Sequence, residues 1–335
     1  MISQNRNISV DVLRGMAMLL VVLGHSMSGC VQEINNSIIY QLIWTLQMPM
    51  FMLISGYVTK YGSQVSSFSA LKQQIQKKTI AYLLPWIMWT FLIRGVICGQ
   101  NNFLDLKWLF WHMDAGYWFL FSIWTIVIVF LISSYFSNKT KQVFIIRTIC
   151  FIGGMIVLVC IGFLVGLSFL CIKLTLYYMP FYYLGYAYTQ IENKYKTKTW
   201  FSCVVSILSA ICLCIWVFLI TRYSISSFNE SFLEIIIRVL SSISGCIAIS
   251  GLVGTKSSII HKMLAWVGYH SIEIYVIHYL FLNTIQLKEK TQLHSIESVG
   301  LVTLNFAITM LLSIVVSVLL CNNTILKRAL FGKKN

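Results

Sequence analysis

The chain has 335 residues, of which 58% are hydrophobic and only 10% are charged, and its mean hydropathy is +0.79. Soluble domains carry about 25% charged residues, so this balance excludes a soluble globular protein and indicates one that crosses a membrane several times. The formal net charge of +15 could suggest a nucleic-acid partner. The basic residues lie mainly in short gaps between apolar runs, however, so we attribute the charge to membrane topology and expect no nucleic acid.

Apolar runs long enough to cross a hydrocarbon core of about 30 Å follow one another along the chain. We predict an all-α, polytopic membrane protein with ten spans, which together form one membrane domain over residues 1–335. The predicted spans are residues 10–30, 38–58, 80–99, 117–135, 143–166, 168–189, 201–220, 232–253, 263–284 and 299–321. The ten cysteines lie mostly within these spans, so we expect neither a disulfide framework nor a metal site.

Lysine concentrates in alternate gaps between the predicted spans. Examples are the groups Lys72, Lys77 and Lys78, then Lys139 and Lys141, then Lys194, Lys196 and Lys198. Because basic loops remain in the cytoplasm, this alternation predicts an even number of spans and places both termini in the cytoplasm. Residues 27–30, MSGC, resemble a lipoprotein cleavage site, but Asp11 and Arg14 would interrupt such a signal and nine further spans follow, so we expect no removable leader.

The first predicted span carries three polar residues of functional interest, Asp11, Arg14 and His25. A charge at the centre of a membrane helix costs at least ~2.5–3.5 kcal/mol, so such groups usually face a partner or a cavity lined by protein. Arg14 and His25 are eleven residues apart. That spacing is three helical turns plus about 20°, so they share a face and lie about 16 Å apart along the axis, with Asp11 one turn before Arg14.

The chemistry of these two side chains suits a reaction at the membrane. An arginine near the inner boundary can bind a phosphate-bearing ligand from the cytoplasm, and the imidazole of His25 can take a proton from a hydroxyl. The structural alternative is that Arg14 pairs with Asp11 at the interface while His25 hydrogen-bonds to another helix. Because Arg14 and His25 share a face, we favour the functional interpretation.

The ninth predicted span contains a second polar stripe. Ser271, Tyr275 and His278 follow i, i+4, i+7 spacing, so they share a face that could turn toward the first span. Glu273 lies about 140° from His278 around the helix and is expected to serve another neighbour, for which Arg238 in the eighth span is one candidate.

These residues resemble the acyltransferase-3 family of bacterial integral-membrane acyltransferases. The family's N-terminal signature is an Asp, an Arg-Gly pair and a His eleven residues after the Arg, which here reads DVLRGMAMLLVVLGH at 11–25. Further matching stretches are QMPMFMLISGY at 47–57, Lys77 and Lys78 ahead of LLPW at 83–86, YWFL at 117–120, YYLGY at 182–186 and GYHSIEIYVIH at 268–278. One departure is Gln47, where many relatives have a histidine.

The resemblance implies a multi-pass enzyme of the bacterial cytoplasmic membrane that moves an acyl group, most often acetyl, from acetyl-CoA to a hydroxyl of a cell-envelope glycan. It implies acetyl-CoA as a co-substrate, no permanently bound cofactor, and possible partner proteins of polysaccharide synthesis. His25, Arg14 and Asp11 would be catalytic, while Arg14, Lys77 and Lys78 would contact the CoA donor. The substrate-binding residues would be Ser271, Tyr275, His278, Ser55, Tyr57 and Trp118.

Two other classes of protein would also use many spans. A glycan exporter, flippase or other transporter could contain buried arginine and histidine, although the two halves of the chain show no repeat-like symmetry. A structural subunit without chemistry fits the aligned Arg14 and His25 poorly. For an acyltransferase, the sequence leaves open whether His25 activates the acceptor hydroxyl or is itself transiently acylated.

Overall fold

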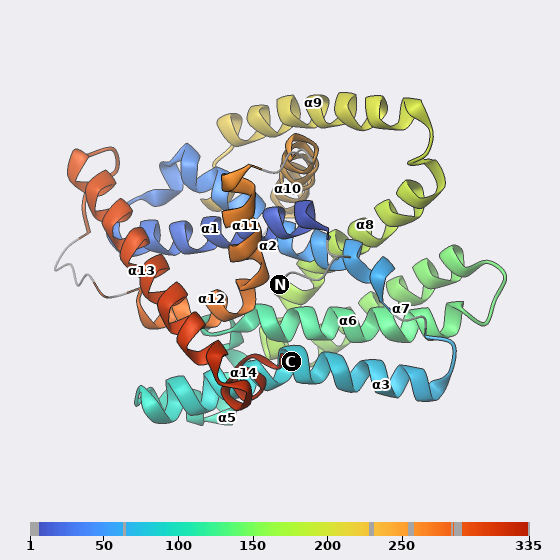
Figure 1. Ribbon diagram of the computed structural model, residues 1–335, viewed down its shortest axis with the longest axis horizontal. Coiled ribbons are helices and arrows are strands. Elements are labelled where there is room, and N and C mark those ends of the chain that lie inside the picture. Colours follow the sequence, from blue (N-terminus) through green and yellow to red (C-terminus); the bar gives the residue numbers. More distant parts are fainter. Residues whose placement is uncertain are drawn as a thin grey trace. The chain divides into compact units, whose positions relative to one another are not determined.

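The computed structural model describes residues 7–62, 65–227, 231–253, 258–282, 284 and 290–333 (Figure 1). These residues form helices and no strand, and Val31 and Thr291 make one isolated β-bridge between them. The prediction of an all-α protein is therefore confirmed. The chain divides into two compact units, the first made of Met1–Lys60 and Tyr183–Val318 and the second of Tyr61–Tyr182 and Leu319–Asn335.

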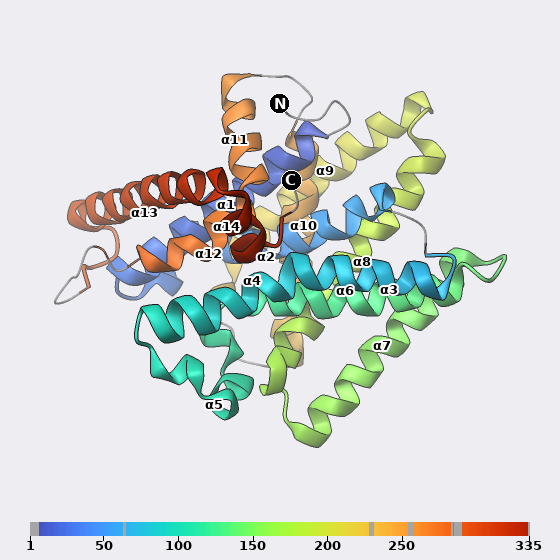
Figure 2. The same cartoon turned by 60° about the horizontal axis from the view of Figure 1, so that its bottom comes forward.

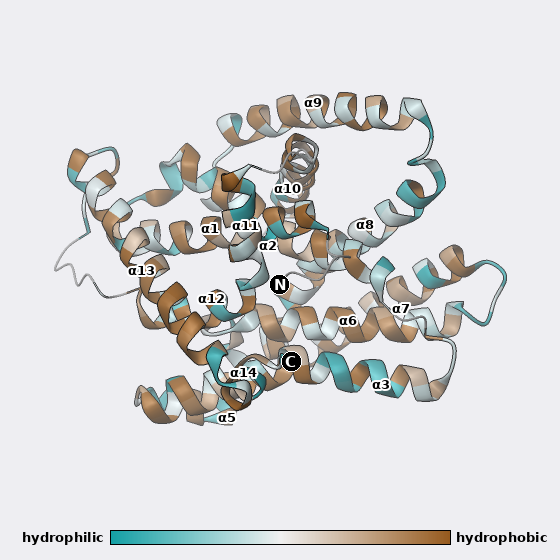
Figure 3. Ribbon diagram, viewed as in Figure 1, coloured by the Kyte–Doolittle hydropathy of each residue, from teal (hydrophilic) through white to brown (hydrophobic). Residues whose placement is uncertain are grey.

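Eight helical segments of the described chain are long and apolar enough to cross a membrane. Each overlaps one of the predicted spans, so the prediction of a multi-pass membrane protein is confirmed. They are α1 (Ile8–Cys30), α2 (Ile38–Tyr57) with its continuation to Tyr61, the segment Phe68–Ile97, α6 (Trp118–Ser137), α7 (Val143–Val165), α9 (Thr199–Arg222), α10 (Phe232–Leu252) and α13 (Ile296–Asn322). Figure 3 shows hydrophobic residues along helices such as α9 and α13.

The third of these segments is longer than the predicted span 80–99 because a polar helix leads into it. It contains α3 (Phe68–Lys78), the π-helix η3 (Thr79–Leu83), α4 (Leu84–Ile87) and a second π-helix, η4 (Met88–Ile97). Pro85 lies in the first turn of α4, where its missing N–H costs no hydrogen bond of that helix. Lys77 and Lys78 are therefore the last residues of α3, and η3 follows them directly as the start of the apolar part of the segment.

The predicted span 168–189 lies within one helix of 24 residues, α8 (Ile172–Tyr195), which contains Pro180. This helix is not among the eight apolar segments, because its first 18 residues include six tyrosines and Lys173 and its last turns carry Gln190, Glu192, Asn193 and Lys194. Its first half belongs to the second unit and its second half to the first unit.

The predicted ninth span, 263–284, is not one continuous helix. It consists of α11 (Ile259–Tyr269), α12 (Ser271–Ile277) and the 3₁₀ turn η9 (His278–Leu280), and residue 283 near its end lies outside the described residues. The break falls at His270, whose backbone leaves the helical region at φ −96° and ψ 17°. The His270 ring packs 4.4 Å from the Trp266 ring, which holds the side chain against the last turn of α11.

In the first unit, α1 packs against α11 and α2, and α10 packs against α9 and α2 (Figures 1 and 2). Glycines allow a close approach between α1 and α11. A Cβ atom added at Gly268 would lie 1.9 Å from the carbonyl oxygen of Asp11, and one added at Gly15 would lie 2.0 Å from that of Leu264. The backbones of the two helices are therefore in direct contact beside Asp11 and Arg14.

Replacing Gly268 by Ala is expected to destabilise the protein by about 1–3 kcal/mol, because the new methyl group must push the α1 backbone away. The measurement is the melting temperature of the purified protein. Gly300→Ala on α13 is the matched control, since a Cβ atom there meets nothing within 4 Å and alanine favours a helix. If Gly268→Ala has the same melting temperature as Gly300→Ala and the wild type, the close packing of α1 and α11 is contradicted.

The second unit buries aromatic residues between its helices. The Trp89 indole donates a hydrogen bond to the Leu330 carbonyl oxygen at 2.9 Å, and its ring stacks on Phe331 at 6.0 Å. These contacts fix α14 (Thr324–Phe331) against η4. The second unit also contains α5 (Leu106–Trp111).

Candidate active site

The first part of the site is a pair of charged residues near the start of α1. Asn7 caps this helix by accepting a hydrogen bond from the Ser9 N–H at 3.1 Å, and the helix then runs unbroken past His25. The Arg14 guanidinium donates to the Asp11 carboxylate at 3.4 Å. The side chain of Asp11 is 6% exposed and that of Arg14 is 25% exposed, so the carboxylate is covered while the guanidinium remains accessible.

The second part of the site is a cluster of rings near the other end of α1. The His25 ring lies 5.4 Å from the His278 ring and 5.2 Å from the Tyr279 ring, measured between centroids. The Tyr279 hydroxyl lies 3.4 Å from His25 Nε2, within hydrogen-bonding distance. His278 is fully buried, whereas His25 and Tyr279 are half-buried. The structure thus brings two predicted site residues, His25 and His278, together from distant parts of the sequence.

His278 is held in a defined orientation. Its Nδ1 lies 3.2 Å from the Ile274 carbonyl oxygen, and because a carbonyl only accepts, Nδ1 carries the proton in this bond. In the neutral ring Nε2 is then an acceptor. It is buried and has no hydrogen-bond partner among the described residues, so a donor from outside the chain would satisfy it.

The other two residues of the predicted stripe lie on the same short helix. Ser271 begins α12, and Tyr275 lies with its ring 5.8 Å from His278 and 6.0 Å from Tyr279. Sequence reasoning missed Tyr279, because a helical wheel places it about 100° from His278 and outside the stripe. Its position directly after His278 was the available signal.

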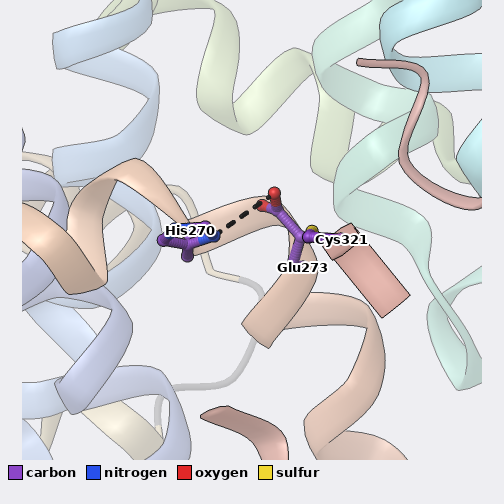
Figure 4. Close-up of side chains that lie close together, drawn as sticks. All are labelled: His270, Glu273 and Cys321. Atoms are coloured by element: carbon purple, nitrogen blue, oxygen red, sulfur yellow. Dashed lines mark ion pairs between the residues drawn. The ribbon is translucent and has the colours of Figure 1, made fainter. Parts of the chain in front are cut away.

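Glu273 pairs with His270, its neighbour across the helix break. Figure 4 shows the two side chains turned toward each other, with His270 Nδ1 3.5 Å from a carboxylate oxygen. Arg238 donates to the Ile225 carbonyl oxygen at 3.3 Å and lies 5.5 Å from the Trp44 ring. The Glu273 side chain is only 1% exposed, so the pair lies buried at the interruption.

Helix α2 brings Gln47 next to the site. A Cβ atom added at Gly24 would lie 3.3 Å from the Gln47 amide oxygen, so this side chain lies beside the residue that precedes His25. The departure from the family's pattern that was noted at Gln47 therefore falls next to His25.

Two predicted substrate-binding residues lie further along α2 and have other partners. Ser55 donates to the Phe51 carbonyl oxygen at 2.7 Å, within its own helix. The Tyr57 hydroxyl lies 3.0 Å from both carboxylate oxygens of Glu192, and Lys60 binds the same carboxylate at 2.6 Å. These contacts tie α2 to α8, and substrate binding by Ser55 and Tyr57 stays a prediction.

Trp118, Lys77 and Lys78 belong to the second unit. Trp118 stacks on Tyr178 with ring centroids 5.4 Å apart, Lys77 is exposed, and the Lys78 ammonium lies 5.9 Å from the Tyr82 ring centroid. Contact of these residues with substrate or CoA also stays a prediction.

Comparison with known proteins gives one family and two curated relatives. A sequence model of an acyltransferase domain, that of the acyltransferase-3 family, matches residues 7–322. Nodulation protein NolL of Sinorhizobium fredii is 25% identical over 236 residues, which cover 63% of this chain and 57% of the relative. NolL of Mesorhizobium japonicum is 25% identical over 233 residues, covering 64% and 57%. The matched part is thus less than two thirds of each relative, and no solved structure matches the chain.

Proposed function

The chain belongs to the acyltransferase-3 family, and from this premise we propose that it transfers an acyl group, most simply acetyl, from acyl-CoA to a hydroxyl of a cell-surface or lipid-linked glycan. The observation that carries the proposal is the cluster of His25, His278 and Tyr279. Two imidazoles and a phenol meet on membrane helices, where polar groups are costly and usually functional.

Each residue of the site has its own role in the proposed reaction. His25 takes the proton from the acceptor hydroxyl, and the oxygen then attacks the carbonyl carbon of the thioester. The carbon–sulfur bond breaks, and CoA leaves as the thiol after receiving the proton from His25. The Tyr279 hydroxyl, 3.4 Å from His25 Nε2, orients the imidazole for both transfers.

The donor reaches this site from the cytoplasm in our proposal. The alternation of lysine-rich gaps supports an arrangement with both termini in the cytoplasm of a bacterium and Arg14 near the inner boundary of its cytoplasmic membrane. The accessible guanidinium of Arg14 would bind a phosphate of CoA, because its planar fork of donors matches phosphate oxygens. Lys77 and Lys78 would add positive charge on the same side.

A glycan exporter is the second candidate function. The interruption at His270 favours it, because discontinuous membrane helices often form the substrate sites of transporters. A transporter would need no base at His25. In cells that lack a transporter, its glycan cargo would remain on the cytoplasmic side of the membrane.

Labelled membranes test the two functions against each other. Vesicles that contain the protein are expected to move label from [1-¹⁴C]acetyl-CoA into extractable glycan, whereas vesicles lacking it should not. The control is the His25→Ala protein at equal membrane level. If label never enters glycan while unlabelled glycan accumulates on the cytoplasmic side of cells lacking the protein, the exporter is the correct function.

A further inference from the structure

A row of polar side chains is buried along one side of α13. They recur every four residues, and each is at most 1% exposed. They are Asn305, Thr309, Ser313 and Ser317. The outward side of the helix instead carries apolar residues that are 45% to 62% exposed, namely Leu304, Leu311 and Val315. The helix thus turns its polar side, which we call the α13 polar face, into the protein.

Most polar atoms of the α13 polar face lack a partner. Ser313 Oγ, Ser317 Oγ and Asn305 Oδ1 make no hydrogen bond within the part of the chain that the structure describes. A buried serine of a helix usually bonds to the carbonyl one turn earlier, as Ser133 Oγ does with the Val129 carbonyl oxygen at 2.8 Å. Each unpaired group costs about 1–3 kcal/mol, so a row of three indicates a binding partner.

Two hydrogen bonds place the α13 polar face beside the His25 cluster. The Asn305 amide donates to Cys30 Sγ at 3.7 Å, at the end of α1, and Thr309 Oγ1 donates to the Phe281 carbonyl oxygen at 3.2 Å, three residues after His278. Figures 1 and 2 show α13 passing alongside α12. The polar face therefore begins where α1 and η9 end, and α13 continues alongside α12, the helix that precedes His278.

His278 supplies an independent observation at this place. Its Nε2 is buried, accepts hydrogen bonds in the neutral ring and has no partner among the described residues. The serine hydroxyls of α13 can donate or accept, and Asn305 Oδ1 only accepts. Asn305 and Ser317 are twelve residues, or about 18 Å, apart along the helix, so a partner for the whole set must offer donors and acceptors along its length, as the hydroxyl groups of several linked sugars do.

We propose that the α13 polar face and His278 Nε2 bind hydroxyl groups of the acyl acceptor and thereby select which acceptor is acylated. This inference rests on the proposed function, since it requires an acceptor rich in hydroxyls. Because these side chains are at most 1% exposed, binding of an acceptor requires the packing around the α13 polar face to open.

The test uses Ser313→Ala and the double variant Ser313→Ala, Ser317→Ala in membranes. The acceptor is the envelope glycan fraction from cells that lack the protein, and the donor is [1-¹⁴C]acetyl-CoA. Each lost hydroxyl is expected to raise the KM for the glycan fraction about 2- to 10-fold and to leave the KM for acetyl-CoA unchanged. Ser133→Ala is the matched control, because this buried serine already bonds within its own helix.

The melting temperature separates binding from a structural role. Removing a hydroxyl that has no partner is expected to leave the melting temperature unchanged or to raise it. Lower melting temperatures with an unchanged glycan KM would assign α13 a structural role and overturn the proposal. A lower kcat with an unchanged glycan KM would assign it to proton or water movement, which overturns the proposal equally.

The wild-type membranes distinguish failure of this inference from failure of the proposed function. If they transfer no label to glycan, the acyl-transfer function is wrong, and the acceptor site is wrong with it. If they transfer label and neither serine variant shifts the glycan KM, the acceptor site alone is wrong.

Discussion

Replacing His25 by Gln is expected to lower the rate of acyl transfer to glycan by about 10²- to 10⁴-fold, the usual contribution of a positioned general base. Glutamine retains hydrogen-bonding groups of similar reach, so Tyr279 keeps a partner, but the amide cannot take a proton at neutral pH. The measurement is the rate of label transfer from [1-¹⁴C]acetyl-CoA into glycan, together with the acetyl content of cellular glycan determined by mass spectrometry.

The matched control for this prediction is His112→Gln, which makes the same change at an exposed histidine of the second unit. It is expected to leave the transfer rate unchanged. If His25→Gln acetylates glycan at the wild-type rate at normal protein level, His25 is not the base. The remaining candidates would then be His278 as the base or the transport function.

Replacing Arg14 by Gln is expected to raise the KM for acetyl-CoA about 10- to 100-fold, because a hydrogen bond to a charged group contributes about 1.5–3 kcal/mol. The KM for glycan should stay the same, since Arg14 lies at the opposite end of the α1 stripe from His25. The KM of Arg14→Lys for acetyl-CoA should lie between those of the wild type and Arg14→Gln, because an ammonium keeps the charge but lacks the planar fork. Steady-state kinetics with each substrate varied in turn measure both effects.

Arg222→Gln is the control for charge, because Arg222 is an exposed arginine at the end of α9. The structural interpretation of Arg14 makes a different prediction. If its task is only to pair with Asp11 at 3.4 Å, Arg14→Gln should lower the melting temperature and leave the KM for acetyl-CoA unchanged. That outcome would remove Arg14 from the donor site.

Much of the fold could be predicted because a bilayer constrains sequence strongly. A span needs about 20 apolar residues and internal hydrogen bonding, so the apolar runs identified eight helices of sufficient length directly. The ninth run was equally apolar in sequence, yet it is broken at His270. Hydropathy carries no signal for such a break, because apolar residues continue on both sides of His270.

The site was predictable where one helix alone determined the geometry. The common face of Arg14 and His25 follows from a spacing of eleven residues, and α1 is indeed continuous between them. Helical spacing does not show which helices lie side by side, so Arg238 on another helix was only one candidate partner for Glu273. His270 pairs with it because the break between α11 and α12 turns the imidazole toward the carboxylate.

The sequence by itself determined that this protein is helical, crosses a membrane several times, belongs with the acyltransferase-3 family and carries Arg14 and His25 on one helical face. The family follows from the motifs that match it, and the other properties depend on composition and local periodicity, which a linear sequence records. Only the tertiary structure brought His278 and Tyr279 to His25 and turned the polar face of α13 inward. Such contacts join residues about 250 or more positions apart, and they depend on how helices pack, which no local pattern of residues encodes.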